Sequence, residues 1–272
     1  MDKLVTIVIP VYTAIPDENE QISLRRNLQV LAKYPFALVC PQSLDVQFYI
    51  DQFAAAHVSY SVQRFDNEYF KSIYGYNQLL LSSAFYRRFE YSRYILICQL
   101  DAYIFRDELT YWCNCAYDYI GAPWMRNFRY TPMILKGKVG NGGLSLRRTR
   151  ALIDLLEYPY PLKSFKQLWA EYHTGSWWKR YLRLPLLIAK SLGYQNTMAY
   201  CLENCWDNED VFLCAFLETT RIRMKTPSAA VAARFSMDTY AEQLYHQSGQ
   251  VLPFGCHAWY KAEYAFWQQF IS

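Results

Sequence analysis

A carboxylate at the end of a predicted buried strand is the first residue here that could do chemistry. Residues 94–98 are apolar on both faces and lead into Gln99, Leu100 and Asp101. A carboxylate at the mouth of such a strand needs a partner, and a divalent cation shared with a diphosphate and water would serve. A turn cap, or an ion pair with Arg106, is the simpler alternative.

A glycine-rich segment is the second candidate. Gly140, Gly142 and Gly143 occupy three of four positions, and a short strand is predicted to begin at the last of them, over 143–146. Glycine lets a backbone come close to a ligand. The spacing matches neither the Rossmann nor the P-loop phosphate-binding motif. A tight turn at the Asn-Gly pair is the structural alternative.

An acidic run that opens an apolar helix is the third candidate. Trp206 precedes Asp207, Glu209 and Asp210, and a helix is predicted over 208–218. Acidic residues at a helix start most often cap its first turn. A carboxylate there that faces a substrate can instead act as a general base.

A late histidine is the fourth candidate. His257 lies in a loop of glycine and aromatic residues, whereas the other three histidines have no comparable context. Imidazole suits Mn²⁺ and Zn²⁺ better than Mg²⁺. A structural role is the alternative for a single histidine.

The elements that must position these segments alternate between strand and helix through residue 98, which predicts a mainly parallel α/β sheet flanked by helices. The second half is less regular, with an inserted aromatic and basic lobe near 160–205. In sequence order, strands are expected at 5–11, 36–40, 57–62, 94–98, 118–121, 143–146 and 229–235. Helices are expected from 17 to about 33, from about 45 to 56, at 66–89, at 149–157 and at 208–218.

Composition narrows the class of protein. The 272 residues are 53% hydrophobic and 18% aromatic, which excludes a disordered or fibrous chain. The net charge of +4 is too small and too dispersed to predict a nucleic-acid partner. The eight cysteines lack the spacing of a zinc site, and those that end apolar runs are expected to be reduced and buried. With no signal-peptide pattern and no apolar run long enough to span a bilayer, a cytoplasmic protein is expected.

The four motifs in this order resemble those of GT-A glycosyltransferases, and in particular an uncharacterised bacterial family of GT-A-like enzymes. The resemblance covers about residues 4–260. It implies one GT-A-like (Rossmann-like) domain over 1–272. Residues 1–105 would be the nucleotide-binding half, and residues 106–272 the acceptor half.

The resemblance assigns roles to residues in this sequence. Asp101 matches the last acid of an Asp-x-Asp motif and His257 a C-terminal histidine, and the two would hold Mn²⁺ or Mg²⁺. Gln99 replaces the first acid, which reduces the negative charge available to a metal. Asp210, or else Glu209, matches the base of inverting enzymes. The remaining positions would contact the nucleotide or the donor sugar: Pro10, Val11, Tyr12, Lys71, Asn77, Gln99, Asp101, Gly142 and Gly143.

The implied activity is transfer of a sugar from a nucleotide-diphosphate sugar, UDP-sugar first, to a glycan or lipid-linked acceptor in polysaccharide biosynthesis. The aromatic and basic composition of the lobe also predicts peripheral contact with the inner membrane face through 176–190. Two alternatives stay open. A nucleotidyltransferase would share the strand-end carboxylate, and a non-catalytic carbohydrate-binding protein with a decayed site would explain Gln99.

Overall fold

The computed structural model describes residues 3–129, 131–171 and 181–271. A six-stranded sheet in the order β3-β2-β1-β4-β7-β6 forms its centre, and a small sheet in the order β5-β9-β8 lies beside it. The large-sheet strands are β1 (Lys3–Pro10), β2 (Phe36–Pro41), β3 (Tyr60–Phe65), β4 (Ser92–Cys98), β6 (Tyr119–Ile120) and β7 (Leu144–Arg148). The small sheet contains β5 (Tyr103–Ile104), β8 (Ser236–Met237) and β9 (Gly255–Cys256).

The predicted mainly parallel sheet is confirmed, because β1 to β4 all run parallel. β7 runs antiparallel to both β4 and β6. Since Leu144 at the start of β7 pairs with Cys98 at the end of β4, the segments that follow β4 and precede β7 meet at one edge of the sheet. The backbone N–H of Gln99 donates to the carbonyl of Gly143 (2.9 Å) and joins them.

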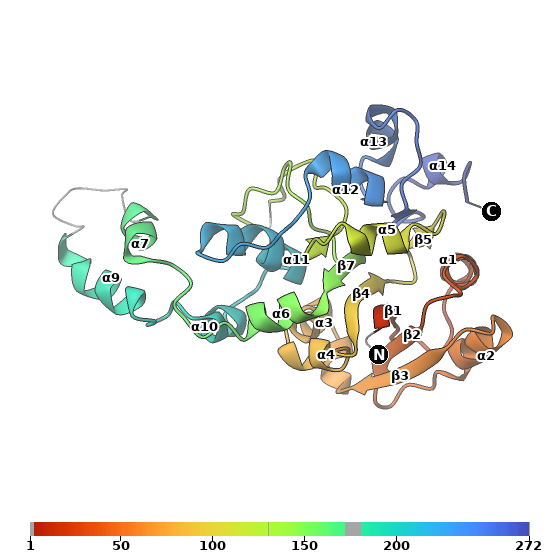
Figure 1. Ribbon diagram of the computed structural model, residues 1–272, viewed down its shortest axis with the longest axis horizontal. Helices are drawn as coiled ribbons and strands as arrows, with labels where there is room; N and C mark the ends of the chain where they lie inside the picture. Colours follow the sequence, from red (N-terminus) through yellow and green to blue (C-terminus); the bar gives the residue numbers. More distant parts are fainter. Residues whose placement is uncertain (1–2, 130, 172–180, 272) are drawn as a thin grey trace.

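Helices cover both faces of the large sheet (Figure 1). One face packs against α1 (Glu18–Val30), α2 (Gln47–Ala55) and α5 (Leu109–Asn114). The other packs against α3 (Ile73–Leu80), α4 (Ser83–Arg87), α6 (Thr149–Leu156), α11 (Glu209–Val211) and η2 (Phe212–Phe216). The other elements of the body are η1 (Asn67–Phe70), η3 (Leu217–Thr219), α12 (Ala229–Phe235), α13 (Ala241–Gln247) and α14 (Tyr264–Trp267).

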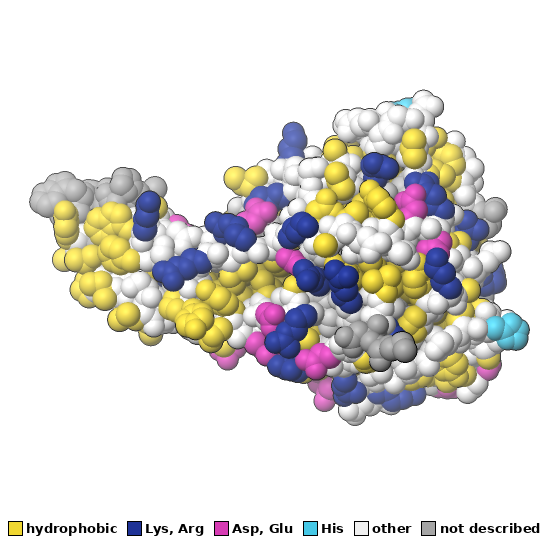
Figure 2. Space-filling view, in the orientation of Figure 1, with side chains coloured by type: hydrophobic (Ala, Val, Ile, Leu, Met, Phe, Trp, Pro, Cys, Tyr) yellow, Lys and Arg dark blue, Asp and Glu magenta, His cyan; other side chains and the backbone are white. Residues whose placement is uncertain are grey.

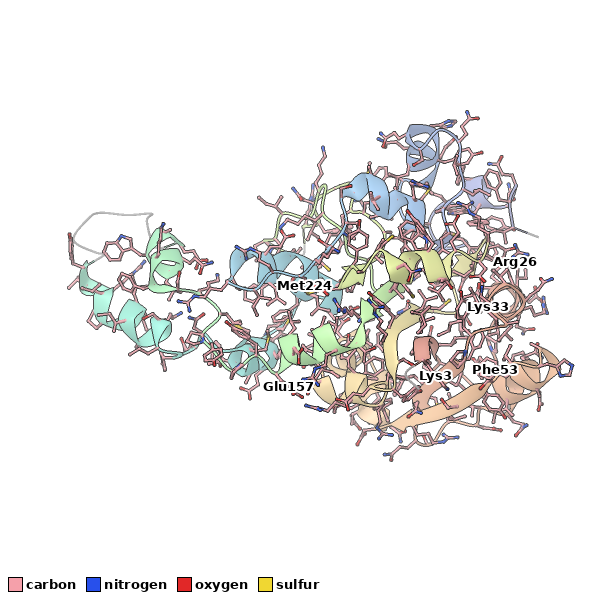
Figure 3. The ribbon with its side chains drawn as sticks, in the orientation of Figure 1. Lys3, Arg26, Lys33, Phe53, Glu157 and Met224 are labelled. Carbon is pink, nitrogen blue, oxygen red and sulfur yellow. The ribbon has the colours of Figure 1, made fainter. Side chains whose placement is uncertain are left out.

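The first helix begins where the acidic turn predicts it. Asp17 and Glu20 form a capping box, in which each side chain accepts from the other residue's backbone N–H. From the same helix, Arg26 donates to the carbonyls of Ile104 and Phe105 and ties α1 to the small sheet (Figure 3).

Two predicted elements are wrong. The helix expected over 66–89 is three separate pieces, because the Ser72 hydroxyl caps a new helix by accepting from the N–H of Gly75, and α3 ends at Leu80. The strand expected at 229–235 is α12, which Ser228 caps and whose alanines favour a helix.

An arm extends from the body (Figure 1). It consists of α7 (Phe165–Glu171) and α9 (Leu184–Ser191), and α10 (Met198–Glu203) connects it to the core through the buried Met198. Residues 172–180 lie outside the described residues, and they include 176–180 of the predicted membrane-contact segment 176–190. None of the helices in the described part of the chain is both long and apolar enough to cross a bilayer.

Candidate functional site

Polar side chains gather at the edge of the sheet where β4 ends and β7 begins. We call Gln99, Asp101, Asp238, His257 and Lys261 the His257 cluster. Asp101 Oδ1 lies 3.2 Å from His257 Nε2, and Asp101 Oδ2 accepts from Lys261 Nζ at 2.8 Å. On the other side of the ring, His257 Nδ1 lies 3.2 Å from Asp238 Oδ1. Asp101 is therefore held by two basic side chains, and Arg106 pairs with Glu108 instead.

Ion pairing controls protonation in the His257 cluster. Burial alone would raise the pKa of Asp101, but His257 and Lys261 outweigh it and hold the pKa well below its ordinary value. Burial disfavours the charged imidazole of His257, yet Asp101 and Asp238 raise its pKa to about 10. Burial also opposes the charge on Lys261, whose pKa is nonetheless raised by Asp101. Each carboxylate in this cluster thus has a cation beside it.

The second group, the Arg147 cluster, is Tyr86, Gly142, Arg147, Glu209 and Asp210. Arg147 is fully buried in β7, and its guanidinium donates to Glu209 Oε1 (2.6 Å) and to the Tyr86 hydroxyl (2.9 Å). Asp210 is 8% exposed. Its burial and its neighbour Glu209 raise its pKa to about 7, against the opposing effects of the Val211 and Gly142 backbone and of Arg147. Two buried carboxylates therefore share one cation.

The double glycine separates the two clusters. A Cβ on Gly143 would lie 1.9 Å from His257 Nε2, and a Cβ on Gly142 would lie 2.1 Å from Glu209 Oε1. Neither distance is possible between non-bonded atoms, so both positions require glycine unless a neighbour moves. The segment Gly142–Gly143 therefore contacts the His257 cluster on one side and the Arg147 cluster on the other.

The other predicted residues lie at different distances from this edge. Pro10 and Val11 are buried, with the Val11 N–H paired to the carbonyl of Val39, whereas Tyr12 is exposed. The pKa of Tyr12 is raised by partial burial and Glu20, and Lys261 also acts on it, so Tyr12 lies beside the His257 cluster.

Of the two other predicted contacts, Asn77 is connected to the Arg147 cluster and Lys71 is not. The Asn77 amide donates to Asn208 Oδ1 (3.1 Å) and connects α3 to the acidic segment. Lys71 lies on an exposed turn, where it pairs with Glu68.

Three charged residues in these clusters, and the Tyr86 hydroxyl, were missed by sequence reasoning. Lys261 lies four residues after His257, and that spacing was a usable signal. Arg147 follows the predicted strand that contains Leu144 and Leu146, and a charged residue at the end of such a strand is also a signal of a buried ion pair. No signal in the sequence pointed to Asp238, because its contact with His257 depends on the pairing of β8 with β9.

A divalent cation can be tested against the donor atoms that converge here. His257 Nε2 lies 3.1 Å from Gln99 Oε1 and 3.2 Å from Asp101 Oδ1. Such separations suit neighbouring ligands of one ion, since two donors about 2.1 Å from a metal at a right angle are about 3.0 Å apart. Asp238 on Nδ1 is the kind of partner that orients a metal-binding imidazole. The donor set fits a divalent ion but is incomplete: among the described residues, no group of three or more His, Cys, Asp and Glu could hold a metal.

A large cavity lies elsewhere. It has a volume of about 640 Å³ and is lined by residues such as Lys3, Arg93 and Arg148. Lys3 and Arg93 are at the amino ends of β1 and β4, so this cavity is at the opposite edge of the sheet from the two clusters. We assign it no role in the chemistry of the site, because neither cluster contributes to its lining.

The chain belongs to a known family. A family described as "Protein of unknown function (DUF5672)" matches residues 59–257, a range that includes both clusters apart from Lys261. No curated protein matches the chain.

Several solved structures are similar in fold. Core-mannan synthase A from Aspergillus fumigatus, in a Mn/GDP form, is 10% identical, with a TM-score of 0.34 over 44% of this chain and 42% of its own. A glycosyltransferase involved in glycosylation of the major capsid of PBCV-1 is 9% identical, with a TM-score of 0.44 over 98% of each chain. The glycosyltransferase GlyE of Streptococcus pneumoniae is 10% identical, with a TM-score of 0.45 over 94% of this chain and 54% of its own. With TM-scores below 0.5, these likenesses do not establish function.

Proposed function

We propose that this protein is a glycosyltransferase that moves a sugar from a nucleotide-diphosphate sugar to a hydroxyl of a glycan or lipid-linked acceptor. The observation that carries the proposal is the double glycine, which has a cation-rich cluster on one side and a carboxylate of raised pKa on the other. Glycosyl transfer needs both: a positive charge for the departing diphosphate, and a base for the acceptor hydroxyl.

The His257 cluster is the side for the leaving group. Lys261 is half exposed, so its ammonium can contact a phosphate while it stays close to Asp101. Tyr12, beside Lys261, is the residue at the end of β1 best placed to contact the nucleotide base. Asp101 and His257, with Gln99, would hold a divalent cation if that cation displaced the proton from the His257 ring, since only neutral imidazole binds a metal. When bound, that cation would neutralise charge that develops on the diphosphate.

The Arg147 cluster is the side for the acceptor. The Glu209 carboxylate is committed to its ion pair with Arg147, so we assign Glu209 a supporting role in the site rather than that of the base. Among the described residues no basic side chain forms an ion pair with Asp210, and its pKa of about 7 lets it bind a proton near neutral pH. In the proposed step, Asp210 takes the proton of the acceptor hydroxyl while that oxygen bonds to the anomeric carbon. The bond from that carbon to the diphosphate oxygen breaks with inversion, and the proton then passes to solvent.

The arm is the proposed membrane contact. Among its described residues, Leu182 and Leu192 are 73% and 81% exposed, and Figure 2 shows hydrophobic side chains gathered on the arm. Residues 172–202 include four basic residues and no Asp or Glu. An exposed apolar surface with basic residues suits an anionic lipid surface, which is where a lipid-linked acceptor would be anchored.

Calorimetry tests the nucleotide site. UDP and GDP, each with and without Mn²⁺, are titrated into the wild-type protein and Asp101→Ala. We expect one nucleotide to bind, and Asp101→Ala to weaken its binding at least tenfold. No binding of UDP, GDP, CDP or dTDP would contradict the proposal and favour a carbohydrate-binding protein. Release of pyrophosphate from a nucleoside triphosphate would instead favour a nucleotidyltransferase.

Vesicle co-sedimentation tests the arm separately. We expect the protein to sediment with vesicles that contain phosphatidylglycerol and not with pure phosphatidylcholine. The double variant Leu182→Glu with Leu192→Glu should abolish this binding. The matched control, Ile15→Glu with Ile134→Glu, changes two exposed residues outside the arm and should leave binding intact. No binding to anionic vesicles would exclude the membrane contact.

A further inference from the structure

Trp206 is the most exposed large hydrophobic side chain in the described part of the chain, at 82%. It lies between α10 and α11, and its ring stacks on Tyr74 of α3 with centroids 5.2 Å apart and an interplanar angle of 24°. Tyr74 is itself 41% exposed. Indole rings are usually well buried, so leaving most of one in water costs free energy that contact with a ligand would recover.

The pair is fixed relative to the Arg147 cluster. Tyr74 and Asn77 lie three residues apart on α3, so they share one side of the helix. The Asn77 amide donates to Asn208, which directly precedes Glu209 and Asp210. Asp210 is the fourth residue after Trp206, so their Cα atoms are at most about 14 Å apart.

The chemistry of the pair favours a sugar ring. Tyr74 covers one face of the indole, and the high exposure of Trp206 leaves other parts of its surface open to a ligand. A flat apolar face can pack against the C–H face of a pyranose, and the indole N–H can donate to a hydroxyl at its edge. A nucleobase could also stack, but in the proposed function its diphosphate is beside Lys261, across the double glycine.

We propose that Trp206 and Tyr74 form a saccharide-binding platform for the acceptor. This rests on the proposed function only in naming the bound glycan as the acceptor. Given the reach from Trp206 to Asp210, the platform holds a ring one or two sugars away from the reacting hydroxyl. The preferred acceptor is therefore an oligosaccharide rather than a single sugar.

Fluorine NMR tests the platform directly. The full chain is labelled with 5-fluorotryptophan, and the Trp206 signal is identified by its loss in Trp206→Phe. Cellotetraose, maltotetraose, mannotetraose and chitotetraose are titrated separately, with glucose as the single-sugar comparison. We expect at least one tetrasaccharide to shift the Trp206 signal saturably and to bind more tightly than glucose. Tyr74→Leu should weaken that binding about three- to tenfold.

Ile73→Ala is the matched control, because Ile73 is a 76% exposed neighbour of Tyr74 on the same helix. It should leave the titration unchanged. If none of the four sugars shifts the Trp206 signal, or if they shift only other tryptophans, the platform is refuted. Nucleotide binding by calorimetry separates the two ideas. If UDP or GDP binds but no sugar shifts the Trp206 signal, the platform is refuted and the proposed function is not. If a sugar binds at Trp206 but no nucleotide binds, the proposed function is contradicted and the platform is not.

Discussion

The His257 and Arg147 clusters lie on opposite sides of the same two glycines, yet they treat their carboxylates in opposite ways. In the His257 cluster, two carboxylates face two basic side chains, and the pKa of Asp101 falls. In the Arg147 cluster, two carboxylates face one guanidinium, and the pKa of Asp210 rises to about 7. The number of nearby cations decides whether the pKa of a buried carboxyl group falls, so that it stays ionised, or rises, so that it can accept a proton near neutral pH.

The largest expected effect comes from removing that proton acceptor. Asp210→Asn keeps the shape of the side chain and should lower kcat about 10²- to 10⁴-fold, because the acceptor hydroxyl loses its base. Nucleotide affinity, which we assign to the other cluster, should stay within about twofold. Asp207→Asn is the control, as a neighbouring acid outside the cluster. Normal turnover in Asp210→Asn would show that the base is elsewhere.

The pH profile sharpens the same comparison. Asp210 must be ionised to act as a base, so kcat/KM of the wild-type protein should fall tenfold per pH unit below about 7 and level off above it. The stability effect has the opposite sign. A carboxyl whose pKa is raised by folding destabilises the folded state as pH rises from its unfolded value towards 7. Asp210→Asn should therefore raise the melting temperature at pH 8 more than at pH 4.

A smaller effect, on stability, is expected from removing the shared cation. Arg147→Met leaves Glu209 buried without its partner and should lower the free energy of unfolding by about 3–5 kcal/mol. The next residue, Arg148, is partly exposed and lies 3.5 Å from Asp118. Arg148→Met should cost about 1 kcal/mol or less. Equal losses in urea denaturation would contradict the assigned difference between the two arginines.

The smallest effects should separate the two sides of the double glycine. Gly143→Ala puts a methyl group against His257 and should weaken nucleotide binding about tenfold, or 1.4 kcal/mol. Gly142→Ala puts a methyl group against Glu209 and should lower kcat about tenfold, with little change in nucleotide affinity. Calorimetry and steady-state kinetics on both variants measure the two effects. The same phenotype in both would mean that the clusters do not act separately.

The sequence predicted the elements whose signal is local. The apolar runs of β1, β2 and β4 identified the parallel sheet, and the acidic turn at Asp17 located the start of α1. The broken helix at 66–89 and the helix at 229–235 were not predicted, because serine caps at Ser72 and Ser228 outweighed the apolar pattern.

The candidate site divides in the same way. The strand-end position of Asp101 and the loop of His257 were visible in the sequence, and the structure brings these two side chains within 3.2 Å. The pairing of Glu209 with Arg147 and of His257 with Asp238 was not visible, since each depends on strands and helices that meet only in the folded chain. The catalytic roles of Asp101, His257 and Asp210 are predictions.

Residues that contact each other in the two clusters are far apart in the sequence, and this separation limits how early in folding the site can form. Gln99 and His257 are 158 residues apart, Asp101 and Lys261 are 160 apart, and Arg147 and Glu209 are 62 apart. Closing such long loops is slow and costs entropy before any contact repays it. During synthesis, the large sheet, whose last strand ends at Arg148, can assemble while the His257 cluster still lacks three of its five members. A ribosome-bound chain that has not yet exposed Lys261 can therefore have a sheet but no complete site, so activity reports on a step that follows assembly of the sheet.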